Sequence, residues 1–149
     1  MKYIGIDPGT QTGVAIWDAL QQSFTSIRTL RLHQALKIVH DCHLQGPVKV
    51  FVEDPNTWVP FKKNKSSAAK IQGAGSIKRD FAIWSEFCED HGIPMVRTRI
   101  QGTMKKVNPG TFQIMTKFRG VTSSHGRDAA MLVFGMSNNR INLPKTVSI

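Results

Sequence analysis

Four side chains in this sequence have the types and spacing that could hold a metal ion. Asp7 ends a short apolar run and precedes a turn rich in Gly, Pro and Thr, and Glu53 ends a β-branched run. His125 and Asp128 lie three residues apart, which places both on one face of a helix. Carboxylate oxygens favour Mg²⁺ or Mn²⁺ over zinc, and a pair of such ions can hydrolyse a phosphodiester.

Each of these residues also has a purely structural interpretation. Asp7 could form an Asx turn with the Gly-rich loop, and Glu53 could pair with a lysine of the loop that follows it. Asp128 could be a first-turn acid that interacts with the helix dipole, and His125 could cap the helix or lie on the surface. The joint pattern favours the metal site, because the chain has only 10 acidic residues and the three candidate acids lie at the ends of its elements.

Hydrophobic periodicity and turn residues predict the elements that must position these side chains. We expect strands at 3–7, 13–18, 24–30, 48–53 and 93–97, and helices at 32–44, 67–90, 109–118 and from 124 to about 137. Asn108 is the expected N-cap of the helix at 109–118, and Ser123-Ser124 are expected to cap the last helix. The order β-β-β-α-β-α-β-α-α predicts an α/β fold, a mixed five-stranded sheet flanked by helices, in one domain over residues 1–149. Gly9 and Gly13 are expected to let a ligand approach the backbone of the first turn.

The charge balance indicates a polyanionic partner. The 149 residues contain 20 Lys and Arg against 10 Asp and Glu, a formal net charge of +10, and residues 55–79 and 91–127 contain no acid. We expect nucleic acid first and an anionic membrane surface second, with simple solubility as the alternative. Cys42 and Cys88 lack partners at zinc-finger spacing, and no apolar run is long enough to span a bilayer. These features predict reduced thiols in a cytoplasmic protein that does not enter the membrane.

The sequence resembles the RuvC family of Holliday junction resolvases, within the ribonuclease H-like superfamily. The matching pieces, in the family's order, are Gly5-Ile6-Asp7-Pro8-Gly9 with Thr12-Gly13, the strand ending in Glu53, Lys70-Ile71-Gln72-Gly73-Ala74-Gly75, and His125-Gly126-Arg127-Asp128-Ala129. The resemblance implies a Mg²⁺-dependent homodimer, for which Mn²⁺ substitutes, that makes paired nicks across a DNA four-way junction. It implies that Asp7, Glu53 and Asp128 are metal ligands, with His125 as a fourth ligand or a proton carrier. The short turn after Asp7 and the segment after Glu53 resemble the compact bacteriophage members of the family.

The basic stretches contain the residues that would contact DNA. Trp58 and Phe61 follow Glu53 in a lysine-rich loop, where a ring could stack on an unpaired base or could equally pack beneath the loop. Lys105 or Lys106 could lie near the scissile phosphate and stabilise developing charge. The other candidates are basic side chains expected to contact the phosphate backbone: Lys62, Lys63, Lys65, Lys70, Lys78, Arg79, Arg99, Lys117 and Arg119.

Two other functions stay open on the sequence alone. A non-catalytic architectural protein would bind junctions through its basic surface without cutting them. An actin-like ATPase would use the turn after Asp7 to hold phosphate, but it would need a second such domain and would leave the basic surplus unexplained. If the protein makes paired nicks, two copies must be related by a two-fold axis. The helix at 67–90, with Ile77, Phe81 and Trp84 on one apolar face, is the candidate for core and interface together.

Overall fold

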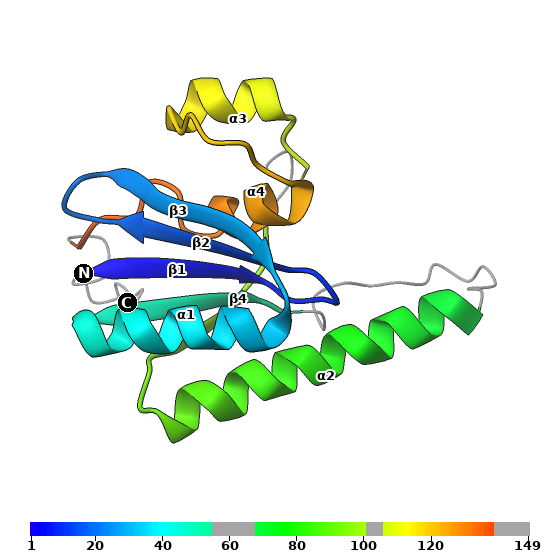
Figure 1. Ribbon diagram of the computed structural model, residues 1–149. Coiled ribbons are helices and arrows are strands. Elements are labelled where there is room, and N and C mark those ends of the chain that lie inside the picture. Colours follow the sequence, from blue (N-terminus) through cyan, green and yellow to red (C-terminus); the bar gives the residue numbers. More distant parts are fainter. Residues whose placement is uncertain (55–67, 101–105, 139–149) are drawn as a thin grey trace, which may run out of the picture.

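The computed structural model describes residues 1–54, 68–100 and 106–138, with the course of the backbone alone for residues 68–74. Its strands are β1 (Lys2–Asp7), β2 (Thr12–Asp18), β3 (Ser23–Leu30), β4 (Val48–Glu53) and β5 (Met95–Thr98). Its helices are α1 (Leu32–Gln45), α2 (Ala68–Asp90), α3 (Pro109–Thr116) and α4 (Ser124–Met131). Figure 1 shows the predicted mixed sheet with helices on both of its faces, and the predicted order of elements is confirmed.

The order of the strands brings the ends of β1 and β4 together. The sheet runs β3-β2-β1-β4-β5, with β1 antiparallel to β2 and parallel to β4. Ile6 pairs with Val52 in the parallel register, so the next residue of each strand, Asp7 and Glu53, reaches the same edge of the sheet at the same level. The two carboxylates that end these strands are therefore neighbours, as the sequence pattern predicts.

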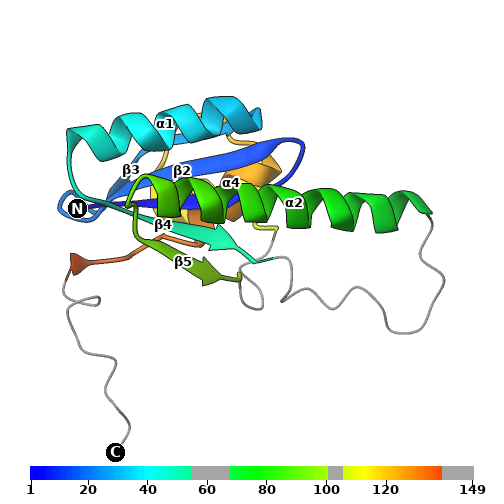
Figure 2. The ribbon, with the colours of Figure 1, turned by 90° about the horizontal axis from the view of Figure 1, so that it is seen from below.

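Alternation along the strands decides which face each side chain occupies. Ile4 and Ile6 pack in one core cluster with α1 and α2, whereas Tyr3 and Phe51 pack in the other with α3 and α4. Figures 1 and 2 show these helix pairs on opposite faces of the sheet. Because successive side chains of a strand point to opposite faces, Asp7 and Glu53 continue the phase of Tyr3 and Phe51. Both carboxylates therefore belong to the face that α4 covers.

Two glycines allow α4 to lie directly on the sheet. A Cβ added to Gly13 would collide with the main-chain carbonyl of His125, and one added to Gly5 would collide with that of Ala129. The expectation that Gly13 admits a ligand is thus wrong, because the backbone of α4 occupies the space beside it. Ser123 caps this helix as predicted, since its hydroxyl accepts a hydrogen bond from the amide of Gly126 at 3.0 Å. The same hydroxyl contacts that of Thr29 on β3, which ties the start of α4 to the sheet.

The boundaries of α4 and β5 differ most from the prediction, and those of the other elements agree within two residues. Helix α4 ends at Met131 instead of continuing to about 137, because the amides of Leu132 and Val133 bond to carbonyls three residues back. Strand β5 covers Met95–Thr98 instead of 93–97, because the amide of Ile93 bonds to the carbonyl of Cys88 and closes the end of α2. Among the described helices, none combines the length and apolar composition needed to cross a membrane. Cys42 and Cys88 are both free thiols.

Candidate metal centre

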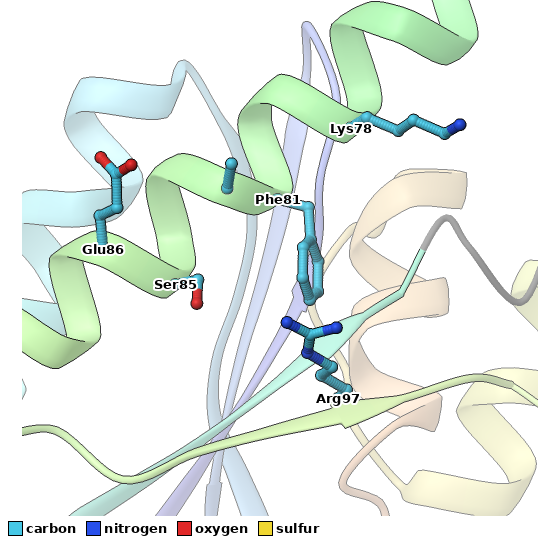
Figure 3. Close-up of a pocket in the computed structure, with 6 residues that line it drawn as sticks. Lys78, Phe81, Ser85, Glu86 and Arg97 are labelled. Atoms are coloured by element: carbon cyan, nitrogen blue, oxygen red, sulfur yellow. The ribbon is translucent and has the colours of Figure 1, made fainter.

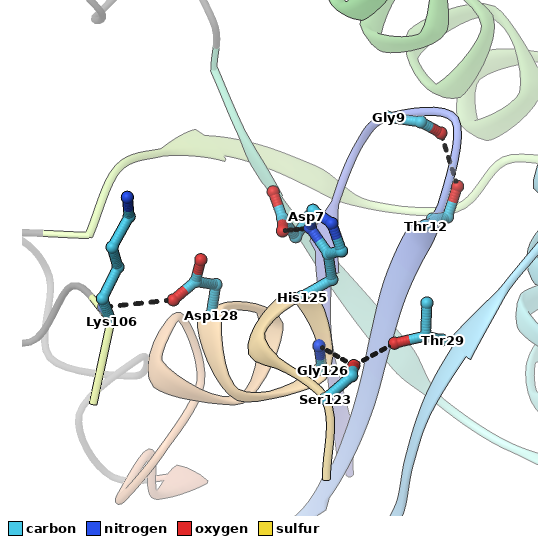
Figure 4. A network of polar contacts seen from close by, with 9 residues as sticks. All are labelled: Asp7, Gly9, Thr12, Thr29, Lys106, Ser123, His125, Gly126 and Asp128. Atoms are coloured by element: carbon cyan, nitrogen blue, oxygen red, sulfur yellow. Dashed lines mark hydrogen bonds and ion pairs between the residues drawn. The ribbon is translucent and has the colours of Figure 1, made fainter. Parts of the chain in front are cut away.

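Asp7 and His125 form the centre of the site (Figure 4). The Nδ1 atom of His125, on the first turn of α4, lies 2.9 Å from Oδ2 of Asp7 at the end of β1. Asp7 is 9% exposed, whereas the side chain of His125 is 49% exposed. The buried carboxylate is thus covered by a ring whose other side reaches solvent.

The electrostatics of Asp7 show a charge that the protein alone stabilises poorly. Its pKa is raised from 3.8 to about 7, and burial is the largest cause. The hydrogen bond from His125 lowers the pKa, but the neighbouring Glu53 carboxylate raises it by repulsion and by a hydrogen bond to Asp7. Two carboxylates in such contact favour a shared proton or a cation between them.

Asp128 approaches the same site from the next turn of α4. Its Oδ1 accepts a hydrogen bond from the main-chain amide of Lys106 at 3.3 Å, and it is half-buried. In the view of Figure 4 the carboxylate of Asp7 lies between the ring of His125 and Asp128, and Asp128 lies toward Lys106. The predicted partners Asp7, Glu53, His125 and Asp128 therefore lie around one end of the sheet, on β1, β4 and α4.

The oxygen and nitrogen donors of this group fit a hard divalent cation, although Asp7 and Asp128 already have hydrogen-bond partners within the protein. Across residues 1–54, 68–100 and 106–138, no three His, Cys, Asp or Glu side chains converge closely enough to form one metal-binding cluster. Asp7 is engaged by His125 and Glu53, and Asp128 is engaged by the amide of Lys106. A buried carboxylate with a pKa near 7 is nevertheless a group that a cation would stabilise, and oxygen ligands suit Mg²⁺ or Mn²⁺.

The described candidates for DNA contact lie on both faces of the sheet. Lys117 and Arg119 are exposed beside α3, on the face of α4, and Arg99 is exposed just after β5. Lys78 and Arg79 are exposed on α2, on the opposite face. The described basic residues are thus distributed over several elements. Lys70 lies in the part of α2 whose side chains are not described, and these candidates fall outside the described residues altogether: Trp58, Phe61, Lys62, Lys63, Lys65 and Lys105.

A pocket of about 320 Å³ lies between α2 and β5, and its lining includes neither Asp7 nor Asp128 (Figure 3). Arg97 of β5 lies over the ring of Phe81 at 5.1 Å, with Lys78, Ser85 and Glu86 around them. Nothing in the sequence distinguishes Arg97 from the other basic residues of the acid-free stretch 91–127. Its guanidinium packs on an aromatic ring, an arrangement that residue type and spacing along the chain do not reveal.

Arg127 is the other residue whose role the sequence did not indicate. It falls in the acid-free stretch 91–127 and so counted toward the basic surplus. In the structure its guanidinium donates to the main-chain carbonyls of Val107 and Thr122. The signal that could have found it is its position between His125 and Asp128, where a long side chain on α4 can reach the segment that leads into α3.

Comparison with known proteins shows the fold and leaves the family open. No family model matches the sequence, and no curated protein matches it. Among solved structures, the chain is similar to RuvC of T. thermophilus in complex with a Holliday junction substrate, with a TM-score of 0.60. The two sequences are 13% identical over 90% of this chain and 91% of that chain. The strand order and the flanking helices match, so the ribonuclease H-like fold predicted from the sequence is confirmed.

Proposed function

We propose that this protein is a divalent-metal-dependent DNA endonuclease that resolves Holliday junctions and other branched DNA by paired symmetric nicks. The observation that carries the proposal is the meeting of Asp7 and Glu53 at one sheet edge beneath His125, within a RuvC-like fold. The net charge of +10 supports a nucleic-acid partner. We further infer a single ribonuclease H-like nuclease domain over residues 1–149, of the short bacteriophage type, acting in the cytoplasm of a bacterial or phage-infected cell.

The assignment of roles follows from the position of each side chain. Asp7, Glu53 and Asp128 would hold Mg²⁺, or Mn²⁺ in its place, which supplies an activated water and charge stabilisation at the leaving oxygen. His125 has a half-exposed ring bonded to a buried carboxylate, so it can carry a proton between Asp7 and the substrate side of the site, or join the ligands. The products would carry 5′ phosphate and 3′ hydroxyl ends.

The basic residues would hold the DNA around this centre. Lys117 and Arg119 are exposed on the same face of the sheet as α4, and they would neutralise phosphates of the bound DNA. Lys106 would lie near the scissile phosphate, because its main-chain amide donates to Asp128 and its side chain is exposed beside the site. No base-reading motif is evident, so backbone and shape would dominate recognition.

Paired nicks require two copies of the chain, and α2 is the proposed interface. Within one copy, Phe81 and Trp84 are buried against the sheet, at 5% and 0% exposure, whereas Ile77 is 36% exposed. The N-terminal half of α2 extends past the end of the sheet in Figures 1 and 2. A second copy would therefore meet the projecting half of the helix. Sedimentation that finds a monomer on junction DNA would contradict this.

The test of the function is incubation with a labelled four-way junction and a matched linear duplex, with and without Mg²⁺. We expect symmetric nicks only in the junction, not in the linear duplex, and only when Mg²⁺ is present. Asp7→Asn should abolish cutting and keep junction binding. The matched control is Asp41→Asn, which removes a carboxylate that is 47% exposed and paired with Lys37 on α1. Tight binding without cutting, in Mg²⁺ and in Mn²⁺, would instead favour an architectural protein.

A further inference from the structure

Residues 107–122 form an excursion from the sheet that carries α3 and returns to the start of α4; we call this segment the α3 excursion. Its inner side is apolar and packed, with Phe112 1% exposed and its ring 6.2 Å from that of Phe24 on β3. Its outer side is open, with Ile114 81% and Val121 99% exposed. Figure 1 shows α3 standing away from the sheet on the side of α4.

One side chain ties together the two ends of the α3 excursion. The Nε atom of Arg127 donates to the carbonyl of Val107 at 2.8 Å, at the start of the segment. One terminal nitrogen of the same guanidinium donates to the carbonyl of Thr122 at 2.7 Å and lies 3.1 Å from its hydroxyl, at the end of the segment. Hydrogen bonds from a charged donor are about twice as strong as neutral ones, so this contact is a substantial restraint on the excursion.

The same restraint connects the excursion to the candidate metal centre. Arg127 lies on α4 between His125 and Asp128, and the residue just before the excursion, Lys106, donates its amide to Asp128. A shift of the excursion would therefore move the amide that holds the Asp128 carboxylate. The outer surface and the metal centre are linked through one turn of helix.

We propose that Arg127 is a positioning residue, which fixes the α3 excursion as a DNA-contacting surface at a set distance from Asp128. This inference rests on the proposed nuclease function. Exposed Lys117 and Arg119 contact phosphates of one junction arm, and the neighbouring Val121 packs against sugars or unpaired bases. Because these contacts locate the DNA and Asp128 belongs to the cutting site, the restraint decides which phosphate is cut.

The substitution that tests this is Arg127→Lys. Arginine offers donors in a rigid planar fork, which reaches Val107 and Thr122 at once, whereas lysine keeps the charge on a single ammonium. The matched control is Arg28→Lys, which makes the same chemical change at an exposed position of β3 that belongs neither to the excursion nor to the proposed DNA-contacting residues. Thr122→Val is a milder variant that removes the hydroxyl and keeps both carbonyl bonds, and it serves if Arg127→Lys does not fold.

The first readout is amide hydrogen exchange, which does not depend on nuclease activity. In Arg127→Lys, peptides from 107–122 should exchange about tenfold faster, while peptides from β2 and β3 and the melting temperature stay close to those of the parent protein. Thr122→Val should give about a threefold increase, and Arg28→Lys no change. Unchanged exchange in both Arg127→Lys and Thr122→Val would overturn the restraint itself.

The second readout is the position of the cut on a labelled junction, at nucleotide resolution and per folded protein. We expect the parent protein and Arg28→Lys to cut at the same phosphate, and Arg127→Lys to spread its cuts over neighbouring phosphates while binding the junction within about threefold of the parent. A merely structural role would lower the amount of active protein and leave the cut position unchanged, and that result would overturn the proposal. If the parent protein cuts no junction, the proposed function fails, and the exchange experiment still decides the restraint.

Discussion

The elevated pKa of Asp7 leads to a prediction about stability that needs no substrate. An ordinary aspartate in the unfolded chain ionises near pH 3.8, whereas Asp7 in the folded protein ionises at about 7. Below pH 3.8 both states hold the proton, so the contribution of Asp7 to folding is fully present there. As the pH rises from 3.8 to about 7, the unfolded chain loses the proton first, and the folded state loses stability.

The size of the effect follows from the same values. Each pH unit between the two pKa values corresponds to about 1.4 kcal/mol, so the loss reaches about 4 kcal/mol above pH 7. Because Asp7 is 9% exposed, solvent screens this energy little. Asp7→Asn keeps the shape and an acceptor for His125 but removes the charge. At pH 8 without metal, the variant should be more stable than the parent by up to about 4 kcal/mol, a rise in melting temperature of roughly 10 °C.

Urea unfolding of both proteins between pH 4.5 and 8 measures this directly. The free energy of unfolding of the parent should fall across the range relative to that of Asp7→Asn, and the two should approach each other at the acidic end. Asp41→Asn is the control, because its side chain is 47% exposed and should show no such divergence. If Asp7→Asn follows the same pH dependence as the parent, or is the less stable protein at pH 8, the reasoning from buried charge is refuted.

Four further outcomes follow from the site and the fold. Saturating Mg²⁺ at pH 8 should raise the melting temperature of the parent by roughly 5–10 °C and that of Asp7→Asn by far less, as calorimetry would record; at pH 5 the gain should shrink, since Asp7 must release a proton to bind the metal. Glu53→Gln should slow junction cutting by at least about 100-fold in single-turnover assays while junction affinity in Ca²⁺ persists. Gly13→Ala should destabilise the protein by about 3 kcal/mol or more in urea titrations, whereas Gly75→Ala, at an open position of α2, should stabilise it by about 1 kcal/mol. Lys117→Gln should weaken junction binding and lower the slope of log K against log salt by about 1, as measured by fluorescence anisotropy.

The architecture could be predicted from the sequence because it depends on local patterns. The alternation of apolar residues in β1 and β4 fixes their faces, and Gly92, with a φ of 65°, ends α2 where the pattern predicts. The end of α4 could not be predicted in this way. The last residues before Ser137 are apolar enough to continue a helix, but Trp17 on β2 donates to the carbonyl of Met136 at 2.8 Å, a contact that depends on the tertiary structure.

The candidate site was predictable in part. Two strand-end acids followed by a helix with an acid in its first turns suffice to place Asp7, Glu53 and Asp128 near one sheet edge. The pairing of Asp7 with His125 was not predictable, because it depends on how closely α4 approaches β1. The role of Arg127 was not predictable for a similar reason. The net charge includes every guanidinium equally and does not reveal that this one donates to main-chain carbonyls.

The close approach of α4 and the unusual acid–base property of Asp7 have one cause in the sequence. Without side chains at Gly5 and Gly13, the first turns of α4 rest on the backbones of β1 and β2. That proximity brings Nδ1 of His125 to within 2.9 Å of Asp7 and also excludes water from the carboxylate, and this exclusion is the largest cause of its raised pKa. Gly13 therefore acts on Asp7, in the candidate metal centre, through the backbone of His125. A larger residue there would separate the helix from the sheet, hydrate Asp7 and lower its pKa toward the ordinary value, so the stability of the fold and the chemistry of the site respond to the same substitution.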